Sequence, residues 1–152
     1  MQNNLDGDDR ESEGGAAWPR ADRPHMPGYG LVDANSGRGL LAWSWAAERL
    51  SKARNYFVST TRSDGLPHSM PVWGVWMEGA FYFSTGRRSR KARNLRTNSH
   101  CVICPENADE AVVLEGVAHE IDSPAALQPM FEAYMEKYNS DLSGMDLSDN
   151  AF

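Results

Sequence analysis

The pattern of apolar and polar positions divides the chain into short helices and strands. Apolar periodicity, capping residues and a proline at a first helical position predict three helices, over residues 40–54, 89–98 and 124–138. Runs rich in β-branched and aromatic residues predict five strands, over residues 56–61, 68–77, 80–84, 100–106 and 110–121. Antiparallel strands with a helix between them favour an α+β fold, mainly β, that forms a small barrel with flanking helices.

Two turn sequences join the first three strands into a meander. Asp64-Gly65 and Glu78-Gly79 favour hairpins on either side of residues 68–77. This middle strand has apolar side chains on both faces, which predicts burial on both sides, beside a partner or a cofactor. Pro71 removes one backbone donor, so we expect an edge, a bulge or a ligand there.

Composition narrows the class of protein. The chain has 152 residues and 41% apolar residues, which suits one soluble domain. It has no signal-peptide pattern and no apolar run of membrane-spanning length, so we expect a cytoplasmic protein with no membrane partner. Cys101 and Cys104 lie three apart on a predicted strand and point to opposite faces, which suits neither a disulfide nor a metal site. We assign no metal ligands.

Charge is segregated along the sequence. Residues 1–37, 38–104 and 105–152 carry net charges of −4, +8 and −10. A basic centre between acidic ends argues against a nucleic-acid partner and favours one local anion site. Six cations lie within ten residues with no acid among them: Arg87, Arg88, Arg90, Lys91, Arg93 and Arg96.

The predicted helix over residues 89–98 begins with charges that oppose its dipole. Ser89 is a favourable N-cap residue, and Arg90 and Lys91 follow it. Each cation there costs about 0.3–1 kcal/mol, which a bound anion offsets, because helix N-termini direct N–H groups at phosphates. The segment is therefore interpreted as a phosphate cradle. The alternative is a solvated basic face.

The same residues carry a family resemblance. The stretch from Tyr82 to Thr85, followed by Ser89, Arg90 and Lys91, resembles the signature of the pyridoxamine 5′-phosphate oxidase-like split β-barrel superfamily, which has an FMN-binding-like fold. Residues 66–76 and 84–95 resemble, more particularly, its flavin/deazaflavin (coenzyme F-420) oxidoreductase group. The likeness extends from Met26 to Tyr138.

The resemblance implies a set of cofactor-binding residues. The hydroxyls of Ser84 and Thr85 and the pair Arg90-Lys91 would hold the phosphate. The second-strand segment Met70, Pro71, Val72 and Trp73 would lie along the ring. Asn94 and Arg88 are weaker candidates. The extra cations suit F-420, which has a phosphodiester and a glutamate tail. FMN is the alternative cofactor. The resemblance also implies a homodimer with the cofactor at the interface.

The implied activity is hydride transfer from reduced F-420 to a small organic acceptor. The alternatives are an FMN-binding oxidoreductase of the same fold, or a non-catalytic flavin or haem carrier. The sequence shows no catalytic triad or paired carboxylates, so we assign no catalytic side chain. True pyridoxamine phosphate oxidases use basic residues near the C-terminus, and only Lys137 follows Arg96 here, which disfavours vitamin B6 oxidation.

Composition and the family resemblance together suggest the limits of the domain. Residues 1–27 are acidic and rich in Gly and Pro, so we expect them to be mostly disordered. From the resemblance, we expect residues 28–152 to form a single split β-barrel domain. Relatives continue beyond the last helix with strands that complete the barrel, whereas nothing after Tyr138 is strand-like. We therefore expect the C-terminal strands to be missing, as in a truncated chain.

Overall fold

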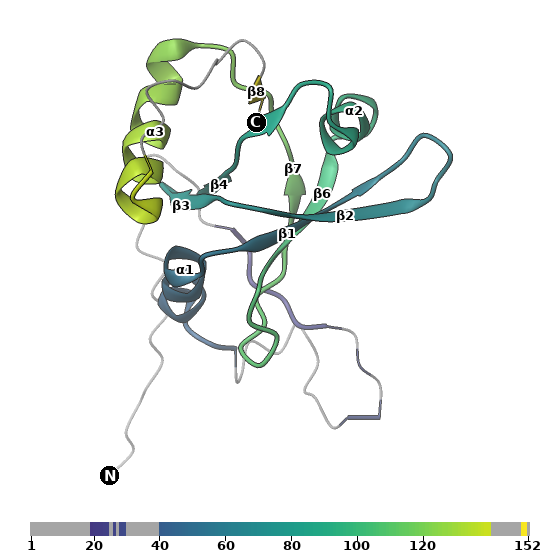
Figure 1. The fold of residues 1–152 in the computed structure, drawn as a ribbon. Coiled ribbons are helices and arrows are strands. Elements are labelled where there is room, and N and C mark those ends of the chain that lie inside the picture. Colours follow the sequence, from purple (N-terminus) through teal and green to yellow (C-terminus); the bar gives the residue numbers. More distant parts are fainter. Residues whose placement is uncertain (1–18, 25, 27, 30–39, 141–149, 152) are drawn as a thin grey trace.

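The centre of the fold is an antiparallel sheet of four strands (Figure 1). The computed structural model describes residues 19–24, 26, 28–29, 40–140 and 150–151. The strand order is β2 (Pro67–Val72), β1 (Tyr56–Thr61), β6 (His100–Pro105) and β7 (Leu114–Val117). Along β1, Tyr56, Val58 and Thr60 are buried while the residues between them are more exposed. This period of two is that of a strand with one buried face.

Two shorter antiparallel pairs complete the β structure. β3 (Val75–Met77) pairs with β4 (Ala80–Tyr82) through a turn in which Glu78 and Gly79 have φ of 51° and 77°. Two consecutive positive φ values are those of the hairpin turn that matches strand twist. β5 (Thr85–Gly86) pairs with β8 (Asn150–Ala151). The α+β class with antiparallel sheets is confirmed, and the three sheets do not close into a barrel within the residues described.

The pairing of β8 corrects the expectation that nothing strand-like follows Tyr138. β8 supplies two residues of backbone pairing to β5, which contains Thr85 of the predicted phosphate-binding residues. A strand of two residues shows no periodicity, so the sequence pattern could not reveal it. Residues 141–149 lie outside the described part of the chain.

Three helices pack on these strands near their predicted positions. They are α1 (Trp43–Lys52), α2 (Arg90–Thr97) and α3 (Pro124–Tyr138), and both α1 and α3 lie against β3 (Figure 1). The N-cap prediction for Ser89 is confirmed, because its side-chain oxygen accepts a hydrogen bond from the Ala92 amide at 3.2 Å. Residues 19–24 line a groove of about 430 Å³ with the start of α1 and residues 111–115. Most of the segment predicted to be disordered, residues 1–18, 25 and 27, lies outside the described residues.

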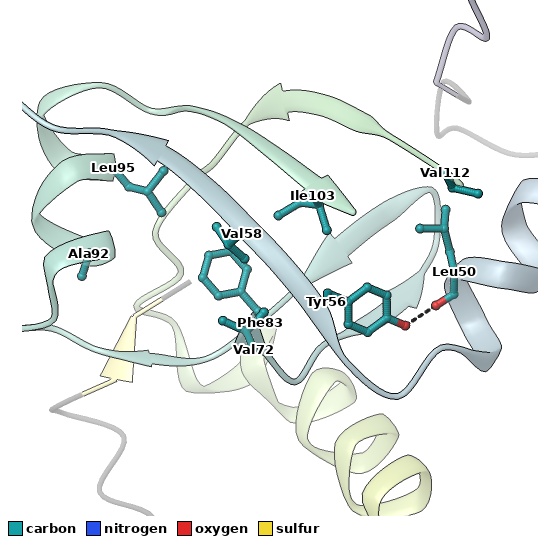
Figure 2. Close-up of a cluster of buried hydrophobic side chains, with 9 residues drawn as sticks. All are labelled: Leu50, Tyr56, Val58, Val72, Phe83, Ala92, Leu95, Ile103 and Val112. Atoms are coloured by element: carbon teal, nitrogen blue, oxygen red, sulfur yellow. Dashed lines mark hydrogen bonds between the residues drawn. The ribbon is translucent and has the colours of Figure 1, made fainter. Parts of the chain in front are cut away.

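The core has two parts. Figure 2 shows the larger cluster, in which α1, α2 and the four-stranded sheet meet around Val58 and the ring of Tyr56; its members are Leu50, Tyr56, Val58, Val72, Phe83, Ala92, Leu95, Ile103 and Val112. The hydroxyl of Tyr56 donates to the Leu50 carbonyl within this cluster. A second cluster joins α3 to β3 through Val75, Leu127, Met130, Tyr134 and Tyr138.

The strand predicted over residues 68–77 is broken, which corrects the expectation of burial on both faces. β2 ends at Val72 and β3 begins at Val75, with Gly74 between them. Val72 is buried, but Met70 and Trp73 are 44% and 43% exposed. β2 is an edge strand, which is where a proline such as Pro71 is tolerated. Among the described residues, β2 is hydrogen-bonded to a neighbouring strand on one side only.

The described residues also bear on membrane, metal and disulfide chemistry. None of the helices between residues 40 and 140 is long and apolar enough to cross a membrane. No group of three or more His, Cys, Asp or Glu side chains in the described part of the chain is placed to hold a metal. Cys101 and Cys104 are both free thiols.

Candidate functional site

Two hydroxyls and one ammonium meet at the N-terminus of α2. Thr85 Oγ1, on β5, lies 3.1 Å from Ser89 Oγ and 3.2 Å from Lys91 Nζ, which donates to it. Thr85 is 7% exposed. Helix α2 begins here, so its first amides are directed toward the same place. The cluster Thr85–Ser89–Lys91, called the cradle below, combines the donors that bind phosphate at helix N-termini.

Lys91 makes no ion pair with an acid in the described part of the chain, and its ammonium donates to the neutral Thr85 hydroxyl. Burial lowers the pKa of Lys91 from its ordinary value. A bound anion would supply the missing charge and reverse that shift. The electrostatics of the cradle therefore favour an anionic ligand.

Two of the six clustered cations are paired with acids that lie far away in the sequence. Arg87 binds Glu120 at 2.6 Å and also binds Asp122, and Arg96 binds Glu120 at 3.1 Å. The acids lie in the segment between β7 and α3, which the fold brings beside α2. The basic island is thus smaller than the sequence suggests. Arg88, by contrast, is exposed and makes no ion pair with a described acid.

Asn94 faces inward from α2. It is 6% exposed, and its Nδ2 donates to Thr60 Oγ1 at 2.9 Å. Thr60 in turn donates to the His68 carbonyl on β2. In this structure Asn94 fastens α2 to β1, while Arg90, at the start of the same helix, is exposed. The fold thus gives Asn94 a structural partner that its sequence position did not reveal.

The second-strand candidates occupy different environments. Met70 pairs with Val58 across β2 and β1, so it shares the face on which α2 packs, at the open edge of the sheet. Val72 belongs to the core, and Pro71 is exposed. Trp73 stacks on Tyr138 of α3, with ring centroids 4.5 Å apart and planes 7° from parallel. One face of the Trp73 ring is thus taken by α3, and the side chain still has solvent exposure.

Ser84 is joined to α3 through its backbone. Its amide donates to Tyr134 Oη at 3.2 Å, and Tyr134 Oη donates to the Trp73 carbonyl at 2.6 Å. The sequence predicted only a helix over residues 124–138 and did not reveal this bridge. A tyrosine within an apolar helix is a weak signal for such a role, because a buried tyrosine hydroxyl needs a polar partner.

Comparisons with known proteins address the fold. A sequence profile of the family described as pyridoxamine 5′-phosphate oxidase matches residues 45–151. A solved conserved hypothetical protein of Mycobacterium tuberculosis aligns with a TM-score of 0.64 and 25% identity, over 74% of this chain and 78% of that one. No curated protein sequence matches significantly.

Two further solved structures carry functional descriptions. A haem storage protein of Vibrio cholerae aligns with a TM-score of 0.60 and 18% identity, over 70% of this chain and 82% of that one. A structure described as an F420 reductase aligns with a TM-score of 0.55 and 19% identity, over 68% of this chain and 86% of that one. At these identities the likeness concerns the fold alone.

Proposed function

The chain belongs to the pyridoxamine 5′-phosphate oxidase family, and on this premise we propose that it is an oxidoreductase using a flavin-type coenzyme whose phosphate binds in the cradle. Coenzyme F-420 is the leading candidate and FMN the alternative. The observation that carries the proposal is Lys91, a partly buried cation with a lowered pKa that contacts the Thr85 hydroxyl at a helix start. Structural cations of this kind are normally paired with an acid.

The remaining candidates fit the same ligand. Arg88 and Arg90 are exposed beside the cradle and can meet further negative charge, which favours the phosphodiester and tail of F-420 over the single phosphate of FMN. Met70 and Trp73 present exposed apolar surface at the edge of β2, suited to a planar ring. Pro71 and Val72 complete that segment, and Asn94 would act by holding α2 in place.

The bound coenzyme would supply the hydride for a small organic acceptor. The part of this chain is to bind and orient: the cradle holds the phosphate end, and the Met70–Trp73 segment supports the ring. We assign no proton-transfer residue. Tyr134 and Tyr56 are unsuited to that task, because burial raises the pKa of both hydroxyls far above neutral pH.

A fluorescence titration of the purified full chain with F-420 and with FMN tests the proposal. The variant Lys91→Met should lose about 10- to 100-fold in affinity, the range for a hydrogen bond to a charged group. Lys52→Met is the matched control, since Lys52 lies on α1 paired with Glu48 and away from the cradle. Equal binding by both variants, or no binding of either coenzyme by the wild type, refutes the proposal.

Two further measurements separate the alternatives. Oxidation of the bound reduced coenzyme by model acceptors distinguishes an enzyme from a carrier. A haemin titration tests the carrier alternative, and preferential haemin binding that is insensitive to Lys91→Met would replace our proposal. The proposed homodimer, with the coenzyme at its interface, predicts a mass of two chains by light scattering and a greater dimer fraction when coenzyme is added.

A further inference from the structure

Helix α3 supplies the hydrogen bonds that the chain needs where it leaves the sheet between β2 and β3. Tyr138 Oη accepts from the Gly74 amide at 2.8 Å, and Lys137 Nζ donates to the Gly74 carbonyl at 3.0 Å. Tyr134 Oη donates to the Trp73 carbonyl at 2.6 Å. These three residues have the i, i+3, i+4 spacing that places side chains on one helix face. One face of α3 thus fixes the backbone of the break.

Of these three residues, only Tyr134 also bonds to the segment between β4 and β5, which leads to the cradle. Its hydroxyl accepts from the Ser84 amide at 3.2 Å, and Ser84 directly precedes Thr85. A tyrosine hydroxyl has one proton to donate and can accept, so both capacities are used here. Tyr134 is 5% exposed, and burial raises its hydroxyl pKa, so the group stays protonated at neutral pH.

We propose that Tyr134 is a positioning residue that sets the spacing between the Trp73 backbone and the cradle. The inference rests on the proposed function, in which Trp73 supports the ring and Thr85 contacts the phosphate. One hydroxyl joins the carbonyl at the first place to the amide beside the second. The bridge therefore aligns two half-sites for one ligand, and a ligand that occupies only one half-site gains nothing from it.

If the bridge is lost, the affinity for the intact coenzyme should fall more than the affinity for its fragments. Tyr134→Phe keeps the ring in its cluster and removes only the hydroxyl. Affinity for the intact coenzyme should fall about five- to tenfold, in line with one or two neutral hydrogen bonds. Affinity for the two fragments should change less than about twofold. The fragments are inorganic phosphate and riboflavin, or the phosphate-free deazaflavin chromophore if F-420 is the coenzyme bound.

Tyr138→Phe is the matched control. It removes hydroxyl contacts to Gly74 and to the Arg54 carbonyl from the same helix, but it does not touch Ser84. We expect it to lower thermal stability to a similar degree and to lower the affinity for the intact coenzyme less than Tyr134→Phe does, because its ring stays stacked on Trp73 and the Tyr134 bridge to Ser84 remains. Equal losses in both variants would show that Tyr134 acts through general stability, and this result would overturn the proposal.

Amide hydrogen exchange gives a readout that needs no bound coenzyme. In the free protein, Tyr134→Phe should speed exchange at Ser84, whereas Tyr138→Phe should not. In the wild type, coenzyme binding should slow exchange at the same amide. Unchanged Ser84 exchange in Tyr134→Phe overturns the bridge itself. A wild type that binds no coenzyme overturns the proposed function and the positioning role with it, so the two failures give different results.

Discussion

Gly74→Ala should destabilise the protein through a single clash. A Cβ at this position would lie 2.1 Å from Phe81 Cζ and 2.8 Å from each Cε atom. Phe81 cannot move freely, because its ring packs edge-on against Tyr56 with centroids 4.5 Å apart. Overpacking of this kind costs about 1–3 kcal/mol. We expect about 2 kcal/mol, which corresponds to a fall of about 4–8 °C in Tm for a chain of this size.

A double-mutant cycle identifies the cause of that loss. Phe81→Leu removes the atoms that the new methyl would meet, so Gly74→Ala should cost less than about 1 kcal/mol in that background. Gly116→Ala is the control, since nothing lies within 4 Å of a Cβ there, and it should change stability by no more than about 0.5 kcal/mol. Urea unfolding of the four proteins measures the coupling. The same cost of Gly74→Ala in both backgrounds would refute the reasoning.

Three other predictions concern charge and capping. Ser89→Ala should lower the free energy of unfolding in urea by about 1 kcal/mol. Ser89→Asp should keep the cap but weaken coenzyme binding. If both variants bind the coenzyme as tightly as the wild type does, the result contradicts the cradle. Burial lowers the pKa of Lys137 from 10.5 to about 8, so folding releases a proton at any pH between these two values. The free energy of unfolding in urea, relative to that of Lys137→Met, should therefore rise from pH 7 to pH 9.5. A fall over this range would contradict the prediction. Glu120→Gln removes the charge shared by Arg87 and Arg96, and coenzyme affinity measured by fluorescence should increase at low salt; a decrease would contradict the electrostatic account.

The sequence predicts those parts of the fold whose signals are local. Residues 56–61 are recognisable as a strand because they are aromatic and β-branched, and Ser89 marks the start of α2 because capping involves only the first turn. Pro124 likewise begins α3, where a first-turn proline costs no hydrogen bond. The cradle is also local in the sequence, since Thr85, Ser89 and Lys91 lie within seven residues of one another.

The remainder depends on contacts between distant segments. The break at Gly74 reflects the ring of Phe81 and hydrogen bonds from α3, and neither leaves a mark in the apolar pattern of residues 68–77. The pairing of Arg87 depends on Glu120, which is 33 residues away. Asn94 is similar, because its partner Thr60 lies 34 residues earlier. Periodicity within a window of one helix or strand cannot detect such partners.

The outer edge of β2 has a consequence for self-association. At the turn of the β1–β2 hairpin, the Arg62 amide donates a hydrogen bond to the Leu66 carbonyl. In an antiparallel pair, hydrogen-bonded residue pairs alternate with pairs that are not hydrogen-bonded to each other, so every second pair along the hairpin is bonded like Arg62 and Leu66. The amides of residues 67, 69 and 71 therefore face away from β1, and two of these positions are Pro67 and Pro71. Ser69 alone offers an outward N–H on this strand. An incoming strand would find too few donors to extend the sheet, which protects this edge from amyloid-like stacking.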